Sequence, residues 1–297
     1  MNAERLTDFQ SRIGRVLSCQ LFFIAGAPKS GTTWVQRLLD AHPEIVCSGE
    51  GHFADKIAAP LSDLFKAYNK HQRLVSERVY ENKPYYSGLK QEYFDFVVLS
   101  LACLIMAQRP ISETVKCIGD KTPRYTFFLE HLGNLFPTAK FIHVIRDGRD
   151  VVVSLCHHAF RAGDKEAVRT NSPEFLKHTE TFAKAWADNV RAARRFGKAH
   201  PDRYREVRYE DLHENPDSAI GGLLEFLGVS VSQDLIRRCK DSAEFRRWSG
   251  GRDKGEEDKT SFFRKGLVGD WKSYFNDASF DVFRKQTDDL LDELGYF

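Results

Sequence analysis

The chain has 297 residues, a length that suits one large α/β domain or two small ones. Hydrophobic residues make up 42% of the sequence and charged residues 29%, which are ordinary proportions for a globular protein. The net charge of +2 argues against a broad basic surface for nucleic acid, although it allows a local anion site. We therefore expect a globular protein with no nucleic-acid partner.

The cysteines and the hydropathy pattern bear on the cellular compartment. Six cysteines are scattered without C-x-x-C spacing, several of them in apolar runs, which indicates reduced core residues rather than disulfides or a metal site. The N-terminal stretch carries acidic residues and no apolar core of signal-peptide type. The longest apolar run, residues 96–107, is about half of the roughly 20 residues that cross a bilayer. We expect a cytoplasmic protein with no metal and no membrane span.

The order of strand and helix patterns predicts an α/β fold. Residues 21–25 and 141–145 are short apolar runs typical of buried parallel strands, and each is followed by a turn and a helix. A third strand is expected within residues 203–212, after a long helix with Ser172 as N-cap and Pro173 in its first turn. This alternation is typical of a doubly wound parallel sheet with helices on both faces.

Two segments interrupt the alternation in what we expect to be a single domain of residues 1–297. Residues 51–116 have helical character and are rich in aromatic residues, and we expect them to form an insertion that supplies a ligand pocket. Residues 249–261 are polar and glycine-rich and predict a mobile loop. The aromatic candidates for the pocket, for which core packing is the alternative, are Tyr80, Tyr85, Tyr86, Tyr93 and Phe94.

The stretch APKSGTTW, after the first predicted strand, is similar to a phosphate-binding loop. Gly26 and Gly31 have the spacing of the triphosphatase pattern G-x-x-x-x-G-K-S/T, but the lysine lies inside the loop, as Lys29, instead of after the second glycine. Backbone amides of residues 30–33 at a helix N-terminus would bind an anion, and Lys29 adds positive charge. A tight turn with solvent-facing polar side chains is the alternative.

Two further patterns indicate phosphate binding. Arg146 ends the second predicted strand, and Ser154 follows it on the next helix, a pairing of guanidinium and hydroxyl that suits a phosphate monoester. Arg264 and Lys265 precede Gly266, which lets the backbone approach an anion closely. Each pattern alone could be a solvated charge cluster. Together, and without an Asp-ended apolar strand to hold magnesium, they indicate a nucleotide with phosphates at both ends of its ribose.

Four stretches in this order resemble the sulfotransferases that use 3′-phosphoadenosine 5′-phosphosulfate (PAPS), over residues 21–276: APKSGTTW, FIHVIRDGRDVVVS, VRYEDLHENP and FFRKGLVGDW. The resemblance implies PAPS as co-substrate, a P-loop-like phosphosulfate loop and a reaction that needs no metal. It assigns the phosphosulfate loop to Lys29, Ser30, Gly31, Thr32 and Thr33, adenine contacts to Trp34, Tyr209 and Phe245, and the 3′-phosphate site to Arg146, Ser154, Arg264, Lys265 and Gly266. Phe245 stands in SAEFRRW, which departs from the usual serine–phenylalanine pair.

The acceptor side departs from the phenol-type enzymes of this family. Their catalytic histidine follows a lysine–threonine pair, whereas GDKTP has Pro123 at that place. The stretch LLDAHPEIVCSGE resembles the tyrosylprotein enzymes, and in these and the heparan-type enzymes a glutamate after the first helix is the base, which implies Glu50. DKTP resembles the heparan-type motif whose lysine lies beside the sulfuryl group, which implies Lys121. His52 is the alternative base, and Glu50 could also be an ordinary loop carboxylate.

These assignments predict a sulfotransferase that moves a sulfuryl group from PAPS to a hydroxyl of a small molecule or carbohydrate and releases adenosine 3′,5′-bisphosphate. Residues 51–116 would bind the acceptor. Two alternatives belong to other classes. A P-loop kinase would share the fold but bind ATP with magnesium, and a non-catalytic nucleotide-binding protein would keep the PAPS motifs without a working base.

Overall fold

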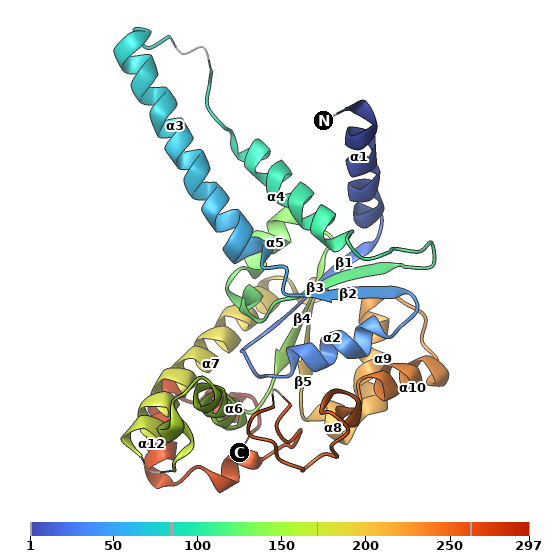
Figure 1. Ribbon diagram of the computed structural model, residues 1–297, viewed down its shortest axis with the longest axis vertical. Coiled ribbons are helices and arrows are strands. Elements are labelled where there is room, and N and C mark those ends of the chain that lie inside the picture. Colours follow the sequence, from blue (N-terminus) through green and yellow to red (C-terminus); the bar gives the residue numbers. More distant parts are fainter. Residues whose placement is uncertain (1, 84–85, 171, 262, 297) are drawn as a thin grey trace.

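A parallel β-sheet forms the centre of the molecule (Figure 1). The computed structural model describes residues 2–83, 86–170, 172–261 and 263–296. Within these ranges the sheet has five strands in the order β2-β3-β1-β4-β5, and every pair is parallel. The strands are β1 (Gln20–Gly26), β2 (Ile45–Gly49), β3 (Cys117–Lys121), β4 (Lys140–Ile145) and β5 (Tyr204–Arg208). The predicted doubly wound α/β fold is confirmed.

Helices cover both faces of the sheet (Figure 1). One face packs against α2 (Thr32–Asp40), α9 (Pro216–Leu227) and α10 (Gln233–Ser242), and the other against α4 (Gln91–Met106), α5 (Leu129–Leu135) and α7 (Pro173–Ala199). The remaining helices are α1 (Ala3–Leu17), α3 (Ala59–Val79), α6 (Gly148–Arg161), α8 (Asp211–Glu214), α11 (Phe245–Trp248), α12 (Asp277–Thr287) and α13 (Leu290–Glu293). Short 3-10 or π helices are η1 (Phe53–Ala58), η2 (Pro123–Phe127), η3 (Lys165–Val168), η4 (Pro201–Arg203) and η5 (Asp270–Ser273).

The apolar run of β1 is explained by its position in the middle of the sheet. Leu21 and Phe23 enter the core beneath α4 and α7, while Phe22 and Ile24 enter the core beneath α2 and α9. A strand buried on both faces cannot alternate apolar and polar residues, which is why the run is continuous.

The start of α7 follows the predicted cap, and α6 has a cap that was not predicted. The Ser172 side chain accepts a hydrogen bond from the backbone N–H of Phe175 at the start of α7, and Pro173 occupies the first turn. Asp147 caps α6 by accepting from the backbone N–H of Arg149. The Asp147 cap fixes the point at which the chain turns from β4 into α6, and therefore the position of Arg146, which lies between the strand and the cap.

Residues 51–116 are mainly helical, as predicted; α3 and the first part of α4 extend beyond the sheet (Figure 1), while the rest of α4 packs on it through Val98, Ala102 and Met106. No described helix combines the length and the apolar character needed to cross a bilayer. Residues 249–261 form turns that one side chain holds together: the Arg252 guanidinium donates to the backbone oxygens of Glu256, Phe263 and Arg264. The mobility of this loop stays a prediction, and Phe262 of the FFRKGLVGDW motif lies outside the described residues.

Candidate active site

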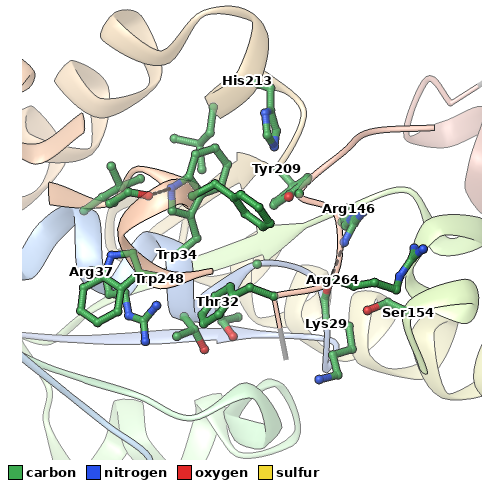
Figure 2. Close-up of a pocket in the computed structure, with 18 of the residues that line it drawn as sticks. Lys29, Thr32, Trp34, Arg37, Arg146, Ser154, Tyr209, His213, Trp248 and Arg264 are labelled. Carbon is green, nitrogen blue, oxygen red and sulfur yellow. Dashed lines mark hydrogen bonds between the residues drawn. The ribbon is translucent and has the colours of Figure 1, made fainter. Parts of the chain in front are cut away.

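A cavity of about 950 Å³ opens where β1 and β4 end, at the switch point of the sheet. Side chains from the three predicted anion motifs gather in it, and Figure 2 shows Lys29, Arg146, Ser154 and Arg264 on one side of the cavity. The predicted residues that line it are Lys29, Gly31, Thr32, Thr33, Trp34, Glu50, His52, Arg146, Ser154, Tyr209, Phe245, Arg264, Lys265 and Gly266. The predicted convergence of these motifs is therefore present in the structure.

The loop between β1 and α2 is shaped to present backbone amides to an anion. Gly31 has φ of 95° and caps α2, and a Cβ at this position would lie 2.5 Å from the Tyr209 ring, so only glycine fits. Ser30 lies beneath the loop instead of in the cavity, with its Oγ buried and without a hydrogen-bond partner among the described residues. Of the amides predicted to bind an anion, that of Ser30 instead donates to the Ala27 oxygen at 3.0 Å, whereas those of residues 31–33 stand at the start of α2, where the first amides have no partner within the helix.

Lys29 brings positive charge to this loop. It has φ of 74°, in the left-handed region that non-glycine residues rarely adopt. Burial lowers the pKa of its amine from 10.5 to about 8, and nearby Arg161 adds to this effect while Glu50 opposes it. A negatively charged ligand would reverse this effect, so Lys29 is suited to binding an anion.

Aromatic side chains form the other side of the cavity. The ring centroids of Trp34 and Tyr209 are 5.2 Å apart, and His213 lies 4.7 Å from each of them. The Trp34 indole is held by a hydrogen bond from Nε1 to the backbone oxygen of Ala243, at 3.1 Å. Rings fixed in this way can stack on a flat heteroaromatic group such as adenine. A place for His213 in the cavity was not predicted from the sequence.

Four predicted phosphate ligands lie near one another, and three of them have protein partners. The Arg146 guanidinium donates to the backbone oxygen of Leu267 at 3.0 Å and stacks 4.3 Å from the centroid of the Tyr209 ring. Arg264 bonds to Glu257 at 2.6 Å and to Asp270. Lys265 Nζ bonds to Asp270 Oδ1 at 2.9 Å. The fourth, Ser154, lines the cavity beside Arg264 (Figure 2).

Glu50 and Lys121 form an ion pair at the edge of the cavity. Lys121 Nζ donates to Glu50 Oε1 at 2.6 Å, and this hydrogen bond is the main reason why the pKa of Glu50 lies below its usual value. The Lys121 side chain is only 5% exposed, whereas that of Glu50 is 54% exposed. Lys121 does not line the cavity itself, so it reaches a ligand through Glu50 or after a shift of the pair.

His52 lies beside the pair and is oriented by a second carboxylate. Its Nε2 is 3.6 Å from Glu50 Oε2, too far for a hydrogen bond, and its Nδ1 is 3.0 Å from Asp55 Oδ1. An ionised Asp55 only accepts, so this contact places a hydrogen on Nδ1 and directs Nε2 toward Glu50. Both Glu50 and His52 line the cavity, with Glu50 Oε2 and His52 Nε2 3.6 Å apart.

Several cavity residues were not predicted from the sequence. They include Arg37, Arg124, Trp248 and Lys254, together with His213. Arg37 stacks on the ring of Trp248, with its guanidinium carbon 3.5 Å from the ring centroid (Figure 2). Lone charged residues on helices and loops carry no pattern that marks them, so only the fold brings them into view.

The described aromatic candidates of the 51–116 region do not line the cavity. Tyr80, Tyr86 and Tyr93 are exposed, Phe94 packs in the core, and Tyr85 lies outside the described residues. The possible pocket role of the four described residues is thus not supported, because none of them is among the residues that line the cavity. That residues 51–116 bind the acceptor stays a prediction.

All six cysteines are buried free thiols, in agreement with the sequence analysis. Within the part of the chain that the structure describes, no group of three His, Cys, Asp or Glu side chains could hold a metal ion. The predictions of a metal-independent reaction and of a cytoplasmic location stay predictions from the sequence.

Comparisons with known proteins agree with the site. A putative protein-tyrosine sulfotransferase from Caenorhabditis briggsae is 27% identical over 284 residues, covering 93% of this chain and 89% of that protein. Protein-tyrosine sulfotransferase 2 from Gallus gallus is 26% identical over 218 residues, which cover 73% of this chain. The chain thus spans about half (53%) of the length of that relative.

Solved structures share the fold at low sequence identity. Mouse sulfotransferase SULT7A1 complexed with PAP matches with a TM-score of 0.55 and 16% identity, over 97% of this chain and 94% of that one. The sulfotransferase domain of the Synechococcus PCC 7002 olefin synthase matches with a TM-score of 0.52 and 21% identity, over 90% and 93%. The model of the sulfotransferase family matches residues 22–233, more than half of the sequence. The chain belongs to the sulfotransferase family.

Proposed function

We propose that this sulfotransferase transfers the sulfuryl group of PAPS to an acceptor hydroxyl and releases adenosine 3′,5′-bisphosphate. The observation that carries the proposal is the position of the Glu50–Lys121 ion pair at the edge of the same cavity that Lys29 and the N-terminus of α2 line. A base, a leaving-group site and an aromatic site are thus adjacent. The solved mouse neighbour, which is complexed with PAP, supports the choice of nucleotide.

The nucleotide would lie across the cavity, with its 5′-phosphosulfate and its 3′-phosphate each beside positively charged side chains. Adenine would stack near Trp34, Tyr209 and Phe245, and the 5′-phosphosulfate would face Lys29 and the amides of α2. The 3′-phosphate would meet the group that contains Arg146, Ser154, Arg264 and Lys265. This placement separates the two phosphates by the ribose, as the predicted motifs require.

Glu50 would act as the general base. The pKa of its carboxyl lies below the usual value because Lys121 donates to it, so the carboxylate is ionised at neutral pH and can accept the acceptor's proton. As that proton moves to Glu50, the hydroxyl oxygen bonds to sulfur and the bond from sulfur to the 5′-phosphate oxygen breaks. Lys29 and the loop amides would stabilise the charge that develops on this leaving oxygen.

The names of the relatives favour tyrosine as the acceptor. Both sequence relatives described above are named for protein-tyrosine sulfotransfer. A tyrosine phenol, with a pKa of about 10, is far more acidic than a sugar hydroxyl, so a carboxylate base can deprotonate it more readily. We infer a tyrosine side chain as the first acceptor to test, ahead of the small-molecule or carbohydrate hydroxyl predicted from the sequence.

The proposal is tested with sulfur-labelled PAPS and a panel of a tyrosine-containing peptide, a small phenol and an oligosaccharide. We expect label transfer by the wild-type protein, and a loss of about 10²–10⁴-fold in Glu50→Gln with unchanged affinity for adenosine 3′,5′-bisphosphate. His52→Ala should lose less. An active Glu50→Gln beside an inactive His52→Ala would assign the base to His52 instead.

The two alternative classes are separated by ligand binding. Thermal unfolding with adenosine 3′,5′-bisphosphate should raise the melting temperature, whereas ATP with magnesium should not. A shift with ATP and magnesium alone would favour a kinase. Binding of adenosine 3′,5′-bisphosphate without transfer to any acceptor in the panel or in a metabolite extract would favour a non-catalytic protein.

A further inference from the structure

One carboxylate of the polar loop 249–261 points into the predicted 3′-phosphate site. Glu257 Oε1 lies 2.6 Å from Arg264 Nη1 and 3.9 Å from Lys265 Nζ. The side chains of Glu257 and Arg264 are 25% and 12% exposed, so the pair is largely shielded from water. A carboxylate oxygen that accepts from a guanidinium stands where a phosphate oxygen would accept from the same group.

The charges of this site are already balanced without a ligand. Arg264 and Lys265 are paired with Glu257 and with Asp270, which contacts both cations. A 3′-phosphate with its negative charge close to −2 would meet two carboxylates at the same cations. If neither carboxylate moved, the bound phosphate would lie close to the negative charges of Glu257 and Asp270 in a partly buried site, and the repulsion would weaken binding. One carboxylate must therefore leave for the phosphate to bind well.

Glu257 is the carboxylate that can leave. Asp270 is 7% exposed and stands between Gly269 and Trp271, whose backbone amides are both fixed by Asp150, at 2.8 and 2.9 Å. Glu257, in contrast, sits in a loop at the surface and its side chain is partly in contact with water.

The main chain on either side of Glu257 would not need to move. The backbone N–H of Gly255 donates to the Lys265 oxygen at 2.9 Å, and that of Asp258 donates to the Arg264 oxygen at 3.2 Å. These bonds hold the loop against the RKG segment independently of the Glu257 carboxylate. A rotation of the Glu257 side chain into solvent therefore frees Arg264 without unfolding the loop.

We propose that Glu257 is an internal competitor of the nucleotide's 3′-phosphate: it occupies Arg264 in the empty site and rotates into solvent when the nucleotide binds. The competition lowers affinity for every ligand with a 3′-phosphate, including the product. Release of adenosine 3′,5′-bisphosphate is thereby made easier, which matters because product release limits turnover in many enzymes. This inference rests on the proposed function, since it requires a 3′-phosphate at Arg264.

The test compares two ligands that differ only in the 3′-phosphate, adenosine 3′,5′-bisphosphate and adenosine 5′-phosphate, by calorimetry at one salt concentration. In Glu257→Gln we expect affinity for the bisphosphate to rise about tenfold, the effect of removing one partly buried charge pair that competes, while affinity for the monophosphate stays the same. Glu257→Ala, which cannot reach Arg264 at all, should behave alike. The matched control is Glu256→Gln, which removes the same charge one residue away; the Glu256 carboxylate accepts from the backbone N–H of Asp253 at 3.0 Å and has no ion pair with Arg264 or Lys265 among the described contacts.

The outcomes separate this inference from the proposed function. If the wild-type protein binds both ligands equally, the 3′-phosphate site itself is wrong. If the wild type prefers the bisphosphate but Glu257→Gln and Glu257→Ala leave that preference unchanged, Glu257 does not compete. A weaker preference in these variants would also overturn the proposal, because Glu257 would then be orienting Arg264 for the phosphate. A gain shared by Glu256→Gln would assign the effect to net charge and overturn it as well.

Discussion

The ionisation of Lys29 should make nucleotide binding weaken as the pH rises through 8. Burial lowers the pKa of its amine from 10.5 to about 8, and only the charged amine attracts the 5′-phosphate. Affinity is therefore complete below that pH and declines above it, until the pKa of the bound state is reached. If the bound ligand restored the pKa of Lys29 to near 10.5, the loss of nucleotide affinity between low and high pH would be at most about 300-fold. Because the Lys29 side chain keeps partial contact with solvent, which screens its charge, we expect the affinity to fall only about tenfold.

The assay is calorimetry with adenosine 3′,5′-bisphosphate between about pH 7 and about pH 9.5, in buffers of different ionisation heat, which also counts the protons taken up on binding. Phosphate monoesters lose their second proton near pH 6, so the charge of the ligand is constant over this range. Lys29→Met should bind more weakly at neutral pH and lose the decline. Constant wild-type affinity without proton uptake, or the same decline in Lys29→Met, would refute the reasoning.

Three further outcomes are expected. Lys121→Met should reduce kcat about 10²–10³-fold with little change in nucleotide affinity. Because Lys121 lowers the pKa of Glu50, the acid limb of the pH–rate profile should also move to higher pH in this variant, and steady-state rates across pH measure both effects. Trp34→Leu should weaken binding of adenosine 3′,5′-bisphosphate about tenfold, the loss of one base–aromatic stack, as measured by calorimetry. Incubation with EDTA should leave the transfer rate unchanged, and a rate restored by magnesium would contradict the expected metal independence.

Much of the α/β architecture could be predicted because β1 and β4 are apolar on both faces and end in polar turns. The strands β2 and β3 could not be predicted in this way. Residues Cys117–Lys121 contain a glycine and two charged residues, which is the composition of a loop, yet all five are buried. Hydrogen bonds and ion pairs to distant residues make this burial possible, and a single strand's sequence does not show such partners.

The site was predictable where its motifs are contiguous and was missed where single side chains converge. Lys29, Arg146 and Arg264 each stand in a recognisable local pattern. His213 and Arg37, by contrast, lie in or directly after quoted motifs, but no position of those motifs assigns them a role, and only the fold shows that their side chains reach the cavity. The pairing of Arg264 with Glu257 also depends on how a loop folds back onto the RKG segment, a tertiary contact that spacing alone does not indicate.

The conformation of the loop that carries Glu50 depends on a buried carboxylate, and this dependence makes a last prediction. Glu50 and His52 have φ of 63° and 50°, a left-handed conformation that costs about 1–3 kcal/mol for each such residue. Asp120, which is 2% exposed, accepts from the backbone N–H of Gly51 between them at 3.0 Å and from the Tyr125 hydroxyl at 2.8 Å. These hydrogen bonds offset the strain and fix the direction of the Glu50 side chain.

Asp120→Asn removes the negative charge and replaces Oδ2, the oxygen nearer to the Gly51 N–H, by a donor, so this N–H keeps only its longer contact with Oδ1, at 3.3 Å. We expect a loss of about 1–3 kcal/mol in the free energy of unfolding, measured with urea. Because Glu50 would then be less well placed, kcat should fall more than tenfold at a temperature where the variant stays folded, whereas nucleotide affinity, which depends on the separate loop after β1, should not change. The control is Asp63→Asn, at an exposed carboxylate on α3 that pairs with Lys66 at 3.4 Å. A variant with reduced stability and full kcat would show that Asp120 supports the fold without orienting the base.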